Sequence, residues 1–188
     1  ALEGQAHVVT ANKGPAAFAY HELEALAESV DRVFMFEGAV MDGVPVFNLA
    51  RDALPAVTVT GFTGVLNSTT NVVLTEMGRG GTLEGALDTM RAARIAEADP
   101  SLDVDGWDTA AKTAALMNVL MGARVTPHTI AREGISAVTT ERAAAAVARG
   151  RRLKLVARAR RDRHTVIGTV GVEEVDRARP PARREAVG

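Results

Sequence analysis

The sequence predicts an α/β to α+β fold, because short β-branched segments alternate with segments of helical period. A strand is expected at residues 8–10, a helix over roughly 16–29 and a second buried strand over 33–40. A strand, a helix and a strand in this order are typical of a parallel sheet. Ligands bind at the carboxyl ends of such strands, which makes Lys13, just past the first strand, a candidate site residue.

The segment TVTGFTGVLNSTTNVVL (58–74) repeats this pattern with a strand, a glycine-punctuated turn and a helix expected to begin near Asn71. A polar quartet, residues 67–70, precedes that helix. In one interpretation a Ser or Thr hydroxyl caps the helix. In the other, the hydroxyls and free N–H groups bind a polar or anionic ligand group. The sequence leaves both interpretations open.

Thr82 is expected to open a further helix, whose inner stripe is Leu83, Leu87, Met90 and Ile95. This helix leads into an acidic segment, EADPSLDVDGWDTAAK. It sets five carboxylates within twelve residues and places a lysine one helical turn after the last: Glu97, Asp99, Asp103, Asp105, Asp108 and then Lys112.

Lys112 belongs to a helix expected to begin near Asp108. There it shares a face with Ala115, Leu116 and Val119, which is the inward stripe. A charge turned toward a core is costly unless it is paired or used. Only three of the 22 cationic residues are lysines, and arginine cannot release a proton near neutral pH. The pattern therefore indicates an acid–base role for Lys112.

Composition excludes several classes of protein. Residues 142–184 carry thirteen cations against four acids, but every aromatic residue lies at or before Trp107, so a salt-bridged face is expected and a nucleic-acid partner is not. The longest apolar run is six residues, whereas about 20 span a bilayer. No membrane association is expected. With no cysteine and no signal segment, a cytoplasmic setting is the default.

Five blocks of sequence carry a resemblance to a known family. They cover almost the whole chain, in the family's order and spacing: TANKGP (10–15), FEGAVMDGVP (36–45), GVLNSTTNVVL (64–74), AEADPSLDVDGWDTAAK (96–112) and the weaker GRRLKLVARA (150–159). Together they resemble homoserine dehydrogenase. The resemblance implies reversible conversion of L-homoserine to L-aspartate 4-semialdehyde with NADP or NAD, in threonine, methionine and isoleucine biosynthesis.

The resemblance also implies roles for individual residues. Lys112 matches the proton donor and acceptor, Asp108 the carboxylate that orients the substrate, and Glu97 the carboxylate that holds its amino group. Asp103 matches a second substrate contact. Lys13 matches a lysine between cofactor and substrate. The implied cofactor contacts are Asn12, Lys13, Asn67, Ser68 and Thr69, and the implied sodium or potassium site, made mostly of backbone carbonyls, is Glu37, Val40, Asp42 and Val44.

The implied organisation has four parts. Residues 1–35 would end a Rossmann-type NAD(P)-binding domain, 36–55 would supply strands of a dimerisation region, 56–176 would form a catalytic domain with a mixed sheet covered by helices, and 177–188 would be a truncated tail. No G-x-G-x-x-G motif occurs in the 188 residues, so we expect a fragment that is inactive alone. The resemblance also implies that the complete enzyme is a homodimer.

Two alternatives remain open. Ile95 stands where many relatives of the family have a larger aromatic residue, which keeps a related dehydrogenase for another small amino or hydroxy acid under consideration. A non-catalytic oligomerisation or regulatory module that lacks the cofactor half is the second.

Overall fold

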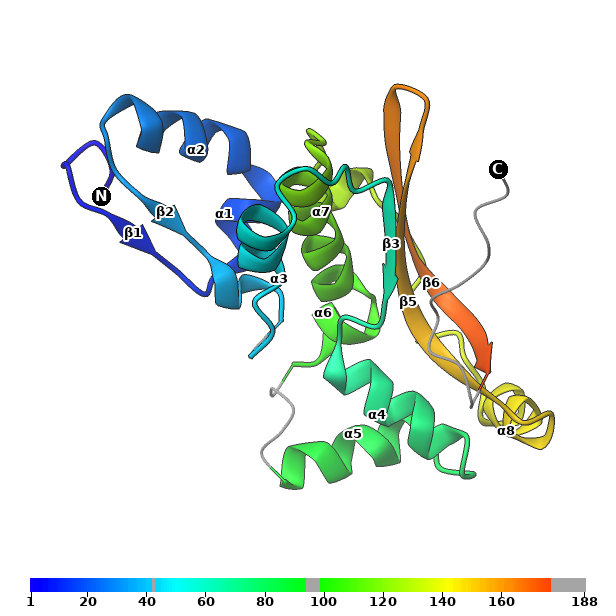
Figure 1. Cartoon of the computed structure of the whole chain (residues 1–188). Helices are drawn as coiled ribbons and strands as arrows, with labels where there is room; N and C mark the ends of the chain where they lie inside the picture. The colour runs from blue at the N-terminus through cyan, green and yellow to red at the C-terminus, as the bar shows by residue number, and fades with distance from the viewer. Residues whose placement is uncertain (42, 94–98, 177–188) are drawn as a thin grey trace. The chain divides into compact units, whose positions relative to one another are not determined.

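The structure is a computed structural model that describes residues 1–41, 43–93 and 99–176 (Figure 1). The chain forms two compact units, each assembled from separate segments. Unit 1 comprises residues 1–62, 110–131 and 159–169. Unit 2 comprises residues 63–109 and 132–158 and, among the described residues, 170–176.

Unit 1 begins with a strand, a helical segment and a strand in the expected order, but the second strand is much shorter than the predicted 33–40 and is not buried, since Met35 is 42% exposed. Strands β1 (Val8–Val9) and β2 (Phe34–Met35) pair in parallel, with Val8 opposite Phe34. Between them the single predicted helix is two helices, α1 (Lys13–Phe18) and α2 (Tyr20–Ser29). The break lies at Ala19, whose φ of −145° is not helical. Helix α1 begins at Lys13 because the side chain of Asn12 accepts a hydrogen bond from the N–H of Gly14.

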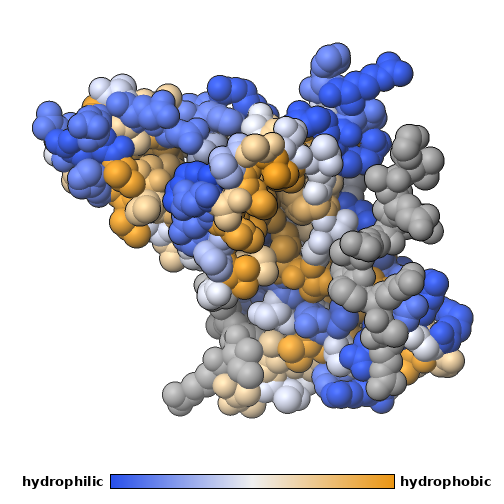
Figure 2. All heavy atoms as spheres, in the orientation of Figure 1, coloured by the Kyte–Doolittle hydropathy of each residue, from blue (hydrophilic) through white to orange (hydrophobic). Residues whose placement is uncertain are grey.

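Several large apolar side chains of unit 1 face solvent. They lie on or next to both strands and in or beside the helical turns that follow: Val9, Val33, Met35, Val44, Leu49, Leu54 and Val57. Figure 2 shows apolar side chains at the surface of the part that carries β1 and β2. A two-stranded parallel sheet with exposed apolar residues is unusual, because parallel sheets are normally covered on both faces.

Residues 36–55 were predicted to contain strands, and this prediction is wrong for the described residues of the range. After Met35 the chain forms three helical turns: η1 (Glu37–Ala39), α3 (Val46–Asn48) and the π-helical η2 (Leu49–Ala53). The carboxylate of Glu37 accepts hydrogen bonds from the N–H groups of Phe47 and Asn48. These donors open α3 and would otherwise be unsatisfied, so the long-range contact favours a helical turn.

Helix α7 (Trp107–Met121) begins as predicted and supplies unit 1 with buried Ala114, Ala115 and Met117. Asn118 on this helix is buried, and both its amide nitrogen and its amide oxygen make hydrogen bonds. Its amide nitrogen donates to the carbonyl oxygens of Ala16 (3.2 Å) and Val125 (3.0 Å), and its oxygen accepts from the N–H of Val125 (3.0 Å). One side chain thus connects α1, α7 and the turn after α7.

Unit 2 packs α4 (Ser68–Met77) against α5 (Leu83–Ala92), α6 (Ser101–Val104) and α8 (Thr140–Ala148). Helix α4 begins three residues before the predicted Asn71, since the side chain of Asn67 caps it. The cap of α5 is Thr82, as predicted, and its inner residues Leu87 and Met90 are buried. Ile95 lies outside the described residues.

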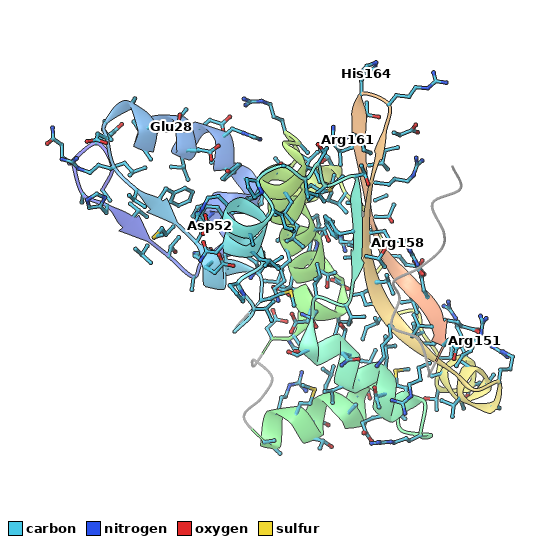
Figure 3. The ribbon with its side chains drawn as sticks, in the orientation of Figure 1. Glu28, Asp52, Arg151, Arg158, Arg161 and His164 are labelled. Carbon is cyan, nitrogen blue, oxygen red and sulfur yellow. The ribbon has the colours of Figure 1, made fainter. Side chains whose placement is uncertain are left out.

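A four-stranded sheet has the order β3 (Gly61–Gly64), β5 (Arg151–Asp162), β6 (Thr165–Asp176) and β4 (Ala131–Arg132), with η3 (Pro127–Thr129) just before β4. A two-residue turn joins β5 and β6 into a hairpin. Several of the cationic residues of 142–184 lie on this hairpin, and three of its arginines are labelled in Figure 3. Arg158 and Glu173 are 2.6 Å apart, as are Arg149 and Glu174, which confirms the predicted salt-bridged face for these residues.

The fold class is confirmed, because a parallel strand–helix–strand unit is followed by a helix-rich region with a hairpin-containing sheet. None of the helices in the described ranges is long and apolar enough to cross a membrane.

Candidate active site

The acidic segment contributes two carboxylates to a polar cluster in unit 2. Asp103 lies on α6 and Asp108 on the first turn of α7. The side-chain nitrogen of Asn67 donates to Oδ1 of Asp103 at 2.7 Å and to Oδ2 of Asp108 at 3.0 Å. The two amide hydrogens of one asparagine therefore serve two carboxylates from different helices.

The orientation of the Asn67 amide is determined by Thr70. Its oxygen accepts from the backbone N–H of Thr70 at 2.8 Å and lies 3.0 Å from the Thr70 hydroxyl. A backbone N–H can only donate, so the atom facing Thr70 is the oxygen and the nitrogen faces the acids. Thr70 is fully buried and Asn67 is 6% exposed. The cluster is consequently rigid.

Two carboxylates on one neutral donor make this region electronegative, which favours a cation such as an ammonium group over a phosphate. Of the two interpretations of the quartet, helix capping is observed, although the cap is Asn67 rather than a Ser or Thr. Ser68 is exposed and Thr69 is buried. The predicted cofactor contacts at Asn67, Ser68 and Thr69 stay predictions.

The turn between α6 and α7 is held by residues that the sequence did not single out. The guanidinium of Arg132 lies 3.7 Å from the centroid of the Trp107 ring and donates to the carbonyl oxygen of Asp105. Gly134 packs so closely that an added Cβ would meet the carbonyl oxygen of Val104 at 2.3 Å. Gly106, with φ of +79°, makes the turn itself. No local signal marks Arg132 or Gly134, because their partners lie more than twenty residues away.

Lys112 lies four residues after Asp108 on α7 and is half-buried. Its neighbours on the predicted inward stripe, Ala115 and Leu116, are buried, which confirms the direction of this face. Glu97, the predicted partner of the substrate's amino group, lies outside the described residues.

Lys13 and Asn12 lie in unit 1, where Lys13 is the first residue of α1 and is half-buried. The side-chain oxygen of Asn12 accepts from the N–H of Gly14 at 2.8 Å, and its backbone N–H donates to the Thr10 hydroxyl at 3.0 Å. The turn that carries Lys13 away from β1 is thus fixed locally.

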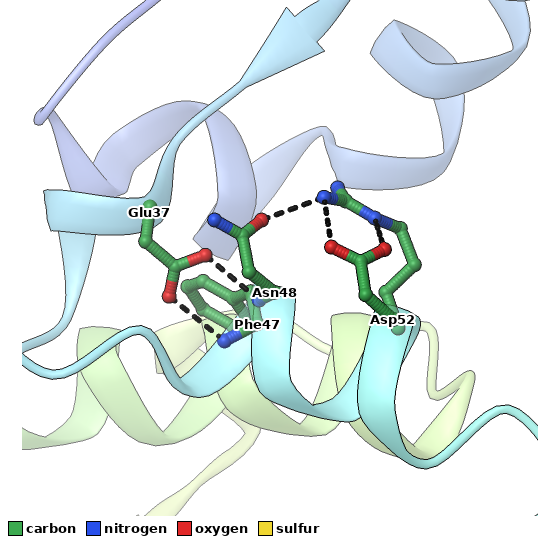
Figure 4. A network of polar contacts seen from close by, with 5 residues as sticks. Glu37, Phe47, Asn48 and Asp52 are labelled. Carbon is green, nitrogen blue, oxygen red and sulfur yellow. Dashed lines mark hydrogen bonds and ion pairs between the residues drawn. The ribbon is translucent and has the colours of Figure 1, made fainter.

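The predicted cation site is described only in part. Figure 4 shows the carboxylate of Glu37 accepting from the N–H of Phe47 (2.9 Å) and of Asn48 (2.8 Å). Val40 is buried and Val44 is 44% exposed, while Asp42 lies outside the described residues. Within the described ranges, no three His, Cys, Asp or Glu side chains come together as a metal site.

Comparison with known proteins shows the family of the chain. The family model described as homoserine dehydrogenase matches residues 45–187, more than half of the sequence. The chain belongs to the homoserine dehydrogenase family. It is 43% identical over 162 residues to an NAD(+)-dependent homoserine dehydrogenase of Pseudomonas canavaninivorans. It is 40% identical over 156 residues to a homoserine dehydrogenase of Methanocaldococcus jannaschii.

These matches cover 86% and 82% of this chain but 46% of each relative, so the chain spans less than half the length of these homoserine dehydrogenases. The crystal structure of a homoserine dehydrogenase from Thiobacillus denitrificans superposes with a TM-score of 0.88 at 32% identity. That superposition covers 95% of this chain and 42% of the other. The fold of nearly the whole chain is therefore that of a family member.

Proposed function

We propose that this chain carries the catalytic region of a homoserine dehydrogenase that interconverts L-homoserine and L-aspartate 4-semialdehyde. The observation that carries the proposal is the pair of carboxylates, Asp103 and Asp108, joined by Asn67 and followed one turn later on α7 by Lys112. An electronegative cluster suits an amino-acid ammonium group, and a lysine suits the proton of an alcohol. Family membership supports the same substrate class.

Each residue then has a chemical role. Asp103, Asp108 and Glu97 bind and orient the substrate, with the ammonium group balanced by carboxylate charge. The side-chain nitrogen of Lys112 accepts the hydroxyl proton when the alcohol is oxidised and returns it in the reverse direction. A bound NAD or NADP supplies the hydride acceptor. Asn12 and Lys13, at the carboxyl end of β1 in a parallel pair, are the described residues we assign to that cofactor.

Lysine substitutions in the full-length protein test the proposal. Lys112→Met should lower kcat for homoserine oxidation by about 10² to 10⁴, the usual contribution of a positioned acid or base. Lys112→Arg should lose almost as much, because arginine keeps the charge and does not release a proton. Lys154→Arg is the matched control. Near-full turnover of Lys112→Arg across the pH profile would contradict the role in proton transfer.

We further propose that the 36–55 region contributes to a homodimer, with a second copy of the chain as its partner. The support is an open cavity of about 410 Å³ in unit 1, lined by aromatic and aliphatic side chains that include Phe36, Phe47 and Leu54. Leu54 is 43% exposed. Leu54→Glu should shift the full-length protein toward monomer in light scattering after gel filtration. Val72→Glu, a similarly exposed residue on α4, should not.

A further inference from the structure

Asn67 makes contacts well beyond its own helix. It caps α4 and, 36 and 41 residues along the chain, binds the side chains of Asp103 and Asp108. We propose that Asn67 is a positioning residue, whose amide holds these two carboxylates together as one binding site for the ammonium group of the substrate. The inference rests on the proposed function and deepens it.

The first support is the choice of side chain at the cap. Asp, Ser and Asn cap helices about equally well, so capping alone does not explain an asparagine. Only the amide offers two hydrogens on the side away from the helix. Both are used here, at 2.7 Å and 3.0 Å from separate carboxylates. The part of the side chain that capping does not need is the part that contacts the acids.

The second support is electrostatic. Two carboxylates brought to one point repel each other, and the cost grows as water is excluded. Asn67, almost fully buried, offsets this with two hydrogen bonds and adds no charge. Asn67 therefore joins the pair without neutralising it. A lysine or arginine at the same position would neutralise it instead.

The third support is that Asn67 has little freedom to move. Its oxygen is held by the N–H and hydroxyl of Thr70, which is completely buried. The distance between the two carboxylates is thus held through α4 as well as through the turn that joins α6 and α7. A site built this way is preorganised for its ligand.

Two substitutions in the full-length protein separate positioning from stability. Asn67→Asp keeps the shape and the cap but replaces the donor with an oxygen that repels both acids. Asn67→Ser keeps a cap and is too short to reach them. Both should raise the KM for homoserine at least tenfold and lower kcat less, with the KM for the cofactor nearly unchanged. The melting temperature should change little in Asn67→Ser and should fall in Asn67→Asp, where three carboxylates repel one another. Thr82→Ser, which changes the cap of α5 and has no role in the proposed site, is the control.

The pH dependence adds a readout that a purely structural role would not change. When the pH is lowered, one of the three crowded carboxyl groups in Asn67→Asp gains a proton before the others and can donate in place of the amide. The ratio of its KM to that of the wild type should then fall, while the ratio for Asn67→Ser stays flat. If either variant fails to fold, Thr70→Val supplies the test, with a smaller rise in the homoserine KM.

Three outcomes overturn the inference. One is a homoserine KM within twofold of the wild type in both Asn67 variants. Another is a KM that rises for the cofactor alone, which would place Asn67 on the cofactor. The third is a flat KM ratio in Asn67→Asp. Wild-type protein that turns over no homoserine would instead contradict the proposed function itself, so the two failures are distinguishable.

Discussion

Arg132 stacks on Trp107, with its guanidinium carbon 3.7 Å from the centroid of the ring. The same guanidinium donates to the carbonyl oxygen of Asp105. One side chain thereby ties β4 to the turn between α6 and α7, which presents Asp103 and Asp108 on either side. Rigidity of this turn is what keeps the two carboxylates within reach of Asn67.

Arg132→Ala should lower the free energy of unfolding by about 1–2 kcal/mol, because it removes a cation–π contact and a charged hydrogen bond. Arg132→Lys should lose less, since an ammonium group still lies over the ring. Urea titration of each variant measures the effect. Arg142→Ala, at an exposed position on α8, is the matched control. Equal losses in the two alanine variants would contradict a specific role for Arg132.

Gly134→Ala should be more damaging than its one added methyl group suggests. The new Cβ would lie 2.3 Å from the carbonyl oxygen of Val104 and 2.7 Å from Cα of Asp105, and both atoms belong to the backbone. Overpacking of this kind costs about 1–3 kcal/mol. Gly171→Ala, where a Cβ meets nothing within 4 Å, should leave the melting temperature nearly unchanged. Thermal denaturation of both variants measures the difference. The homoserine KM should rise only in Gly134→Ala.

Glu37→Gln should destabilise unit 1 by about 1–2 kcal/mol, since a neutral amide accepts less strongly from the N–H groups of Phe47 and Asn48. Glu28→Gln, on the exposed side of α2, serves as the control. Chemical denaturation distinguishes the two variants. A Glu37→Gln protein as stable as the wild type would show that the carboxylate charge has no part in holding α3.

The predicted cation site has its own test. If Glu37 lies beside carbonyl groups of Val40 and Val44 that bind a monovalent cation, sodium or potassium should raise the melting temperature more than choline at equal ionic strength. The difference should shrink in Glu37→Gln. Identical melting curves in sodium and choline chloride would remove the site.

The environment of Lys154 should make the free energy of unfolding depend on pH. It donates to the side chains of Asn71 and Thr75, and burial, followed by the charge of Arg152, lowers its pKa below the ordinary value of 10.5. Between the lowered pKa and 10.5 the unfolded chain binds more protons than the folded one, so stability should rise with pH in that window. Lys154→Met should lack this rise.

The measurement is the difference in unfolding free energy between wild type and Lys154→Met, followed from about pH 8 to pH 10. Tyr20, whose pKa is raised by burial and by its bond to Glu24, is present in both proteins, so its effect cancels in this difference. Parallel curves for the two proteins would show that Lys154 is not perturbed.

Local sequence determined the elements whose signals lie within one or two turns. Three features follow from neighbours within four residues of one another, and all three are observed: the β-branched segment at Val8, the Thr82 cap and the inward stripe around Lys112. The five sequence blocks likewise indicated the family that the comparisons establish. Such signals are readable because capping and periodicity depend on a few adjacent residues.

Tertiary structure decided what depends on residues far apart in the chain. A helical turn begins at Val46 in place of a predicted strand, because Glu37 reaches the N–H groups of Phe47 and Asn48. Asn67 meets Asp103 and Asp108 only when α4, α6 and α7 have packed, and Arg132 finds Trp107 in the same way. A hydrogen bond between residues 36 positions apart leaves no periodic trace in the sequence. Its geometry exists only once burial of the apolar faces has brought the helices together.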